Sequence, residues 1–69
     1  MTFSDVKIGA LPRGDDLEVR VRVLEVEGAE MVDVREFVPS TETYGRGLLM
    51  SLNDAKPLAK LLLDAARLR

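Results

Sequence analysis

Two stretches of alternating hydrophobic and polar residues predict a β-hairpin over residues 17–37. From Leu17 to Val23, aliphatic side chains alternate with charged ones, which is the period of a half-buried strand. The segment Met31–Phe37, which alternates from Val32 to Arg35, is the expected partner strand, and the four residues Val26–Ala29 between the strands suit a tight turn. A symmetric two- or four-residue turn fixes one register, because the numbers of paired residues then have a constant sum.

This register sorts the hairpin into an aliphatic face and an arginine-bearing face. The aliphatic face pairs Val21 with Val34 and Val23 with Val32. The other face pairs Arg20 with Arg35, Arg22 with Asp33 and Leu24 with Met31, and it ends at Phe37. We therefore expect three guanidinium groups to share one small surface. A three-residue turn at Gly28 would instead shift the pairing by one step and break the match between valines.

Two further strands and one helix are predicted outside the hairpin. Alternation over residues 6–10 predicts a short first strand, which the turn-rich segment 11–16 ends. The polar segment Pro39–Gly47 predicts a mobile connection that contains Arg46, and Leu48–Leu52 follows as a fourth strand.

The C-terminal helix is predicted to start at Asn53 or Asp54. Asp54 is the better cap, since it puts Pro57 at the third helical position, where a missing N–H costs little. The polar residues between Leu58 and Leu68 form one narrow stripe, and all others there are leucine or alanine. The stripe consists of Lys60, Asp64 and Arg67.

A helix with so narrow a polar stripe has more apolar surface than one sheet can cover. Leu58, Leu61, Leu62, Ala65 and Leu68 fit a face against the sheet, whereas Ala59, Leu63 and Ala66 point elsewhere. These three residues either sit at the helix edge or fraying end, or they pack against a second copy of the helix in a symmetric dimer. We favour the dimer, with an interface formed by Leu58, Leu61, Leu62, Leu63 and Ala66.

Length and composition narrow the classes of function. The 69 residues make a single domain, 1–69, and the absence of cysteine and histidine excludes thiol chemistry, histidine acid–base catalysis and most zinc sites. Because the carboxylates fall at turns and edges, none forms a convincing acid–base pair, and we expect no enzyme activity and no metal site. The N-terminus carries no signal-like pattern and no segment is long enough to cross a membrane, so we expect a cytoplasmic protein, nucleoid-associated if the source is bacterial.

The net charge of −2 argues against a polyanion binder that works through bulk charge. Any nucleic-acid site must therefore be local, and the arginine-bearing face is the candidate. Guanidinium groups beside aromatic rings are typical of surfaces that hold single strands. The candidate binding residues are Arg20, Arg22, Arg35, Phe37, Tyr44 and Arg46.

A solvated sheet face is the alternative, with Arg22 and Asp33 paired for solubility alone. The two like charges of Arg20 and Arg35, placed opposite each other, weigh against it, because such a pair is unfavourable unless an anion neutralises it. Glu18 and Glu36 are the nearby carboxylates that could do so.

The ordered set Gly28, Met31–Phe37, Gly45–Gly47 and Met50–Asn53 resembles the positive-cofactor-four family of transcriptional coactivators over residues 17–65. The resemblance implies an α+β fold: a curved four-stranded antiparallel sheet followed by a C-terminal helix, homodimeric through its helices. It also implies binding of single-stranded or melted DNA, with no catalysis and no cofactor. Arg35 matches the strand arginine that approaches the DNA backbone, and Arg46 matches the basic residue of the glycine loop.

Several family positions are not matched. A basic residue and an aromatic on the first hairpin strand, lysines at the turn and a tryptophan after the second strand are replaced here by Leu24, Val26, Glu27, Ala29 and Val38. From the residues themselves we expect Arg20 and Arg22 to compensate. The predicted function is sequence-indifferent binding of single-stranded DNA in transcription or DNA maintenance, with the transcription machinery as a further partner. A dimeric scaffold or protein-interaction module that has lost nucleic-acid binding is the alternative.

Overall fold

The structure, a computed structural model, describes residues 5–68, with side chains from Gly9 onward. Four strands form one antiparallel sheet in the order β1-β2-β3-β4, and one helix follows. The elements are β1 Asp5–Pro12, β2 Glu18–Val26, β3 Ala29–Val38, β4 Thr43–Ser51 and α1 Leu52–Arg67. The α+β architecture predicted from the sequence is confirmed.

The central hairpin has the predicted register. Every pair from Glu18↔Phe37 to Val26↔Ala29 is present, with Arg20 opposite Arg35. The turn contains Glu27 and Gly28, at φ of 52° and 84°. Two successive residues with positive φ match the twist of an antiparallel hairpin, and this turn admits no shift of register.

The edge strands are longer than their sequence patterns indicate. The first strand continues through Leu11 and Pro12, beyond its expected end at Ala10. The fourth strand begins at Thr43 and not at Leu48, so residues 43–47, expected in a mobile connection, belong to a strand that pairs with β3. Leu52, expected in the strand, is the first residue of the helix.

The predicted start of the helix is also wrong. Ser51 is the N-cap, and its Oγ accepts a hydrogen bond of 3.2 Å from the backbone N–H of Asp54. Pro57 therefore lies inside the helix and not in its first turn. Two residues of the expected polar stripe, Lys60 and Asp64, form an ion pair of 3.0 Å.

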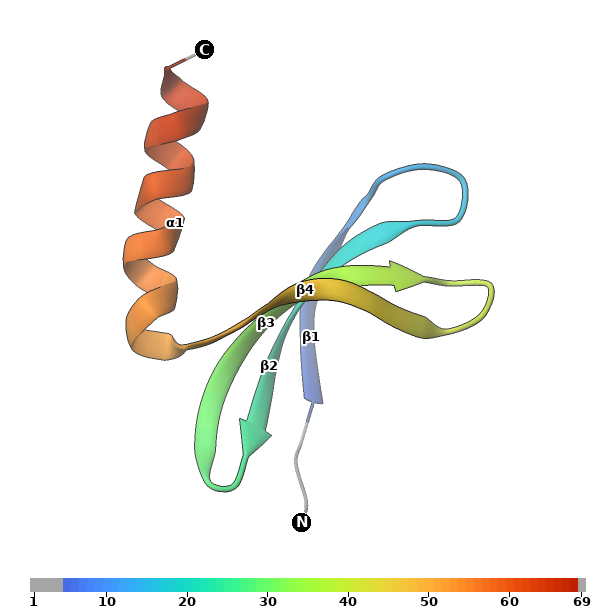
Figure 1. Ribbon diagram of the computed structural model, residues 1–69, viewed down its shortest axis with the longest axis horizontal. Coiled ribbons are helices and arrows are strands. Elements are labelled where there is room, and N and C mark those ends of the chain that lie inside the picture. The colour runs from blue at the N-terminus through green and yellow to red at the C-terminus, as the bar shows by residue number, and fades with distance from the viewer. Residues whose placement is uncertain (1–4, 69) are drawn as a thin grey trace.

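The helix stands beside the twisted sheet and does not lie flat on it (Figure 1). It contacts β3 and β4, and none of its described residues is buried. The radius of gyration is 13.3 Å, whereas a compact chain of this length has one of about 11 Å. A single chain thus leaves its helix and sheet only loosely associated.

The best-buried side chains lie on one side of the sheet. We call this side the arginine face, defined by Arg20, Arg22, Asp33, Arg35 and Phe37, and the opposite side the valine face, defined by Val21, Val23, Val32 and Val34. Leu24, Asp33 and Phe37 are the buried residues among those described. All three belong to the arginine face, which therefore holds what core the single chain has.

Candidate functional site

The hairpin register brings three predicted binding residues together on the arginine face. Arg20 and Arg35 are directly paired, and Arg22 is paired with Asp33 one step further along the same face. Their side chains remain partly accessible, at 22% for Arg20, 14% for Arg22 and 25% for Arg35. The expected juxtaposition of guanidinium groups is thus present, although much of each side chain is covered.

Asp33 is the centre of this surface. Its side chain is 1% exposed and accepts hydrogen bonds from Nε of both Arg22 (2.8 Å) and Arg35 (2.8 and 3.0 Å). A carboxylate between two guanidinium groups neutralises part of their charge and fixes their orientation. The sequence pattern pairs Asp33 with Arg22 alone. It does not predict the second set of hydrogen bonds, from Arg35 two residues further along β3.

Arg20 is held by a different set of groups. Its Nε donates to Glu18 at 2.5 Å, its Nη1 donates to the Tyr44 hydroxyl at 3.2 Å, and its Cζ lies 3.4 Å from the centre of the Phe37 ring. The hydrogen bond to Glu18, and next the one to Tyr44, raises the pKa of Arg20 above its ordinary value. Of the two carboxylates expected to neutralise this face, Glu18 does so, while Asp33 takes the place expected for Glu36 beside Arg35.

The two aromatic residues differ in accessibility. Phe37 is 5% exposed beneath Arg20, so a base could stack on this ring only after Arg20 had moved away. Tyr44 is 40% exposed, with its ring centre 4.7 Å from that of Phe37 and 3.9 Å from Cζ of Arg22. Cation–π contacts thus already use part of both rings.

Arg46 lies in a β-bulge at the edge of this surface. Arg35 pairs with Gly47 and Phe37 pairs with Tyr44, so Gly45 and Arg46 together stand opposite one residue of β3. Arg46 is exposed, and the neighbouring Gly45 carbonyl accepts a hydrogen bond of 3.0 Å from Arg35 Nη1. The expected loop arginine is therefore part of a strand next to the arginine face.

Gly47 allows the two strands to come this close. A side chain at this position would overlap with the Arg35 Cβ and with the backbone carbonyl of Val34. The role of Gly47 in the structure is therefore close packing of β4 against Arg35.

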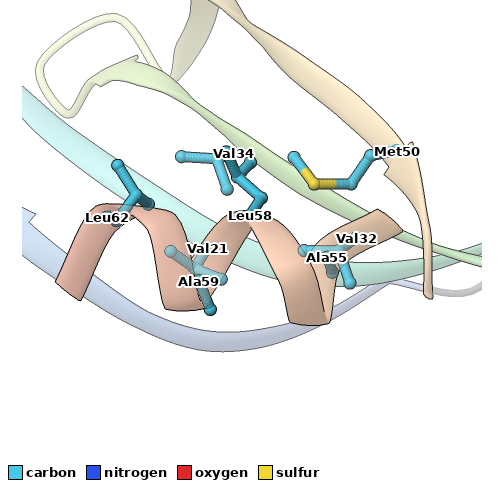
Figure 2. A pocket seen from close by; sticks show the side chains of 8 residues that line it. All are labelled: Val21, Val32, Val34, Met50, Ala55, Leu58, Ala59 and Leu62. Atoms are coloured by element: carbon cyan, nitrogen blue, oxygen red, sulfur yellow. The ribbon is translucent and has the colours of Figure 1, made fainter. Parts of the chain in front are cut away.

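The valine face has a different character, because an open apolar groove of about 310 Å³ separates it from the helix. Figure 2 shows the helix and sheet side chains facing each other across this groove. The groove is lined by Val21, Val32, Val34, Met50, Ala55, Leu58, Ala59 and Leu62. Ala59, expected to point away from the sheet, is thus part of the helix face that looks toward it.

The predicted interface residues are divided between this groove and the outer side of the helix. Leu58 and Leu62 line the groove, although Leu62 is still 63% exposed. Leu61, Leu63 and Ala66 are exposed and do not line it. The helix therefore presents leucines both toward and away from the sheet.

Other kinds of site find no support in the described residues. The described side chains, from residue 9 to residue 68, contain no group of three or more carboxylates that could hold a metal ion. Over the same range, no helix has the length and apolar character that crossing a membrane requires.

Comparison with known proteins gives no match that assigns a role to these side chains. No family model, no curated protein and no solved structure gives a significant match to this chain.

Proposed function

We propose that this protein is a homodimeric module that binds single-stranded DNA with little sequence preference across its arginine face. One observation carries the proposal: Arg20, Arg22 and Arg35 are gathered on one side of the β2–β3 hairpin and are held in fixed orientations. Guanidinium groups fixed side by side suit the phosphates of a flexible strand, which can adjust its spacing to theirs.

The contacts of the arginines indicate recognition of the backbone rather than of the bases. Within the described part of the chain, Arg20 and Arg35 each use Nε and Nη1 for protein contacts. Since a guanidinium has five N–H groups, donors remain for a phosphate. With Phe37 covered, Tyr44 offers the accessible aromatic surface, so stacking should add less than the phosphate contacts.

The dimer is supported by the apolar surface that one chain leaves open. The accessible surface is 5,520 Å², whereas a compact monomer of this mass exposes about 4,300 Å². A stable interface hides about 800 Å² on each partner. Helix leucines from a second copy, seated against the valine face and the outer side of α1, would cover such an area.

A second candidate function is a dimeric protein-interaction module without nucleic-acid binding. Glu18 and Asp33 favour it, because these two carboxylates already neutralise much of the charge of three arginines. On this alternative the arginine face is a self-satisfied polar surface whose role is structural.

Fluorescence anisotropy of a labelled oligothymidine, with a duplex of equal length as control, separates the two candidates. We expect the single strand to bind more tightly than the duplex, and log affinity to fall linearly with log salt by about 0.7 per phosphate contact. Equal binding of both, or no binding at low salt, would favour the interaction module.

Arg46→Gln is the variant that tests the surface with least risk to the fold, because Arg46 is exposed in the bulge. Loss of one phosphate contact should weaken binding and reduce the salt slope by about 0.7. Lys60→Gln removes the same charge from the exposed side of the helix and is the matched control. Equal effects of both substitutions would show that only net charge matters.

A further inference from the structure

Asp33 combines near-complete burial with a place at the centre of the arginine face. It is the one fully buried side chain in the described part of the chain, and it carries a charge. Both of its carboxylate oxygens accept from arginine Nε atoms at 2.8 Å. Among the described side chains, those of residues 9–68, no buried polar atom lacks a hydrogen-bond partner, so this carboxylate is satisfied by the surface that it underlies.

The position of these hydrogen bonds on the guanidinium groups matters for ligand binding. Nε lies at the stem end of the guanidinium, so a bond there fixes the plane of the group without using both terminal nitrogens. Arg35 is held a second time, through Nη1 and the Gly45 carbonyl. Arg22 is held a second time as well, because its guanidinium lies against the Tyr44 ring.

We propose that Asp33 is a positioning residue for nucleic-acid binding. Its carboxylate holds Arg22 and Arg35 side by side, so that neither has to be ordered when a phosphate arrives. The gain from this preorganisation exceeds the loss from placing a negative charge under the site. The proposal rests on the function proposed above and adds a role for an acidic residue that binds no ligand itself.

A purely neutralising role for Asp33 predicts the opposite change in binding when its carboxylate is removed. If the carboxylate only neutralises the arginines, its removal raises the local positive charge and should tighten the binding of a polyanion. If the carboxylate positions them, its removal should weaken binding even though the charge becomes more favourable. The direction of the change therefore separates positioning from neutralisation.

Asp33→Asn is the test variant, and Asp64→Asn is its control. Asparagine keeps the shape of aspartate but turns an NH₂ group toward one guanidinium, whereas Asp64 is a partly exposed helix carboxylate that pairs with Lys60. We expect Asp33→Asn to weaken oligothymidine binding about tenfold at moderate salt, by analogy with the loss of metal affinity when a group that orients a metal-binding side chain is removed. Asp64→Asn should leave binding unchanged or slightly tighter. Equal or tighter binding by Asp33→Asn overturns the proposal.

A second measurement on the wild-type protein covers the case in which Asp33→Asn does not fold. The Nε–H signals of Arg22 and Arg35 are followed by NMR during titration with oligothymidine. Positioning predicts that both signals persist near their free positions while the Arg46 signal moves. Loss of both signals on binding would mean that the phosphate displaces Asp33, which contradicts the proposal.

The two proposals fail in different ways. Absence of any oligothymidine binding by the wild-type protein overturns the proposed function, and the role of Asp33 with it. Wild-type binding combined with tighter binding by Asp33→Asn leaves the proposed function standing and overturns the positioning role alone.

Discussion

The two faces of the sheet reverse the usual relation between polarity and burial. The arginine face is rich in charge, yet it contains Asp33 and Phe37, at 1% and 5% exposed. The valine face is aliphatic, yet an open groove lies between it and the helix. Within one chain, therefore, side chains of the arginine face are well buried, whereas the valine face is only partly covered.

The difference in burial follows from the length of the side chains on each face. Arginine has a long apolar stem and a planar group, so Arg20 can cover a ring and reach a carboxylate within the same hairpin. Valine side chains are short, and a groove lined by Val21, Val32 and Val34 stays open between them and the helix. Such a face needs an opposing surface, and the helix of the same chain supplies only part of it.

The largest effect is expected from charges placed in the groove. Leu58→Asp combined with Leu62→Asp should weaken dimerisation by more than about 100-fold, because each buried leucine contributes about 1.5–3 kcal/mol. Sedimentation velocity over a concentration series measures this change. Leu11→Asp, at an exposed leucine of β1, is the control and should leave association unchanged. A wild-type protein that is monomeric at all concentrations would contradict the dimer.

The next effect concerns the arginine face. Phe37→Ala should lower the free energy of unfolding by about 3–5 kcal/mol, the range for truncating a buried aromatic side chain. It also removes the ring against which Arg20 lies. Urea denaturation measures the loss, with Val34→Ala on the half-buried valine face as the comparison. A smaller loss for Phe37→Ala than for Val34→Ala would mean that the core is on the other side of the sheet.

A smaller effect is expected where the sheet passes into the helix. Ser51→Ala should lower the free energy of unfolding by about 1 kcal/mol, because the N–H of Asp54 loses its capping oxygen. Thermal unfolding followed by circular dichroism gives the value. Asn53→Ala, the same kind of truncation inside the first turn, should have a lesser effect. The reverse order would favour the start of the helix expected from the sequence.

The hairpin could be predicted in detail because two independent signals agree. Alternation fixes which residues share a face, and the turn at Glu27 and Gly28 fixes the register. A shift of one residue would have turned every valine to the wrong side. This part of the fold depends on local sequence, which is why pattern alone was sufficient.

The edges of the fold depend on tertiary contacts and were harder to predict. Residues 43–47 contain two glycines and no apolar alternation, yet they form a strand because β3 offers hydrogen bonds and Gly47 permits close approach. Ser51 is as good a cap as Asp54, and the end of the sheet decides between them.

The pairing of the arginines could be predicted from the sequence, but their side-chain contacts could not. Pairing brought the arginines together as expected. Sequence spacing does not say how a long side chain folds back, so the cover of Arg20 over Phe37 could not be foreseen. The shared bond of Asp33 to two arginines depends on rotamers in the same way.

The two glycines beside Arg46 impose unequal limits on how this surface can change. A methyl group at Gly45 would make ordinary contacts with Glu36, whereas one at Gly47 would overlap with Arg35. Arg46 itself can be exchanged without strain on the fold, since it is exposed. The charge at position 46 can therefore vary, whereas the close spacing of β3 and β4 requires glycine at position 47, a residue without a functional group of its own.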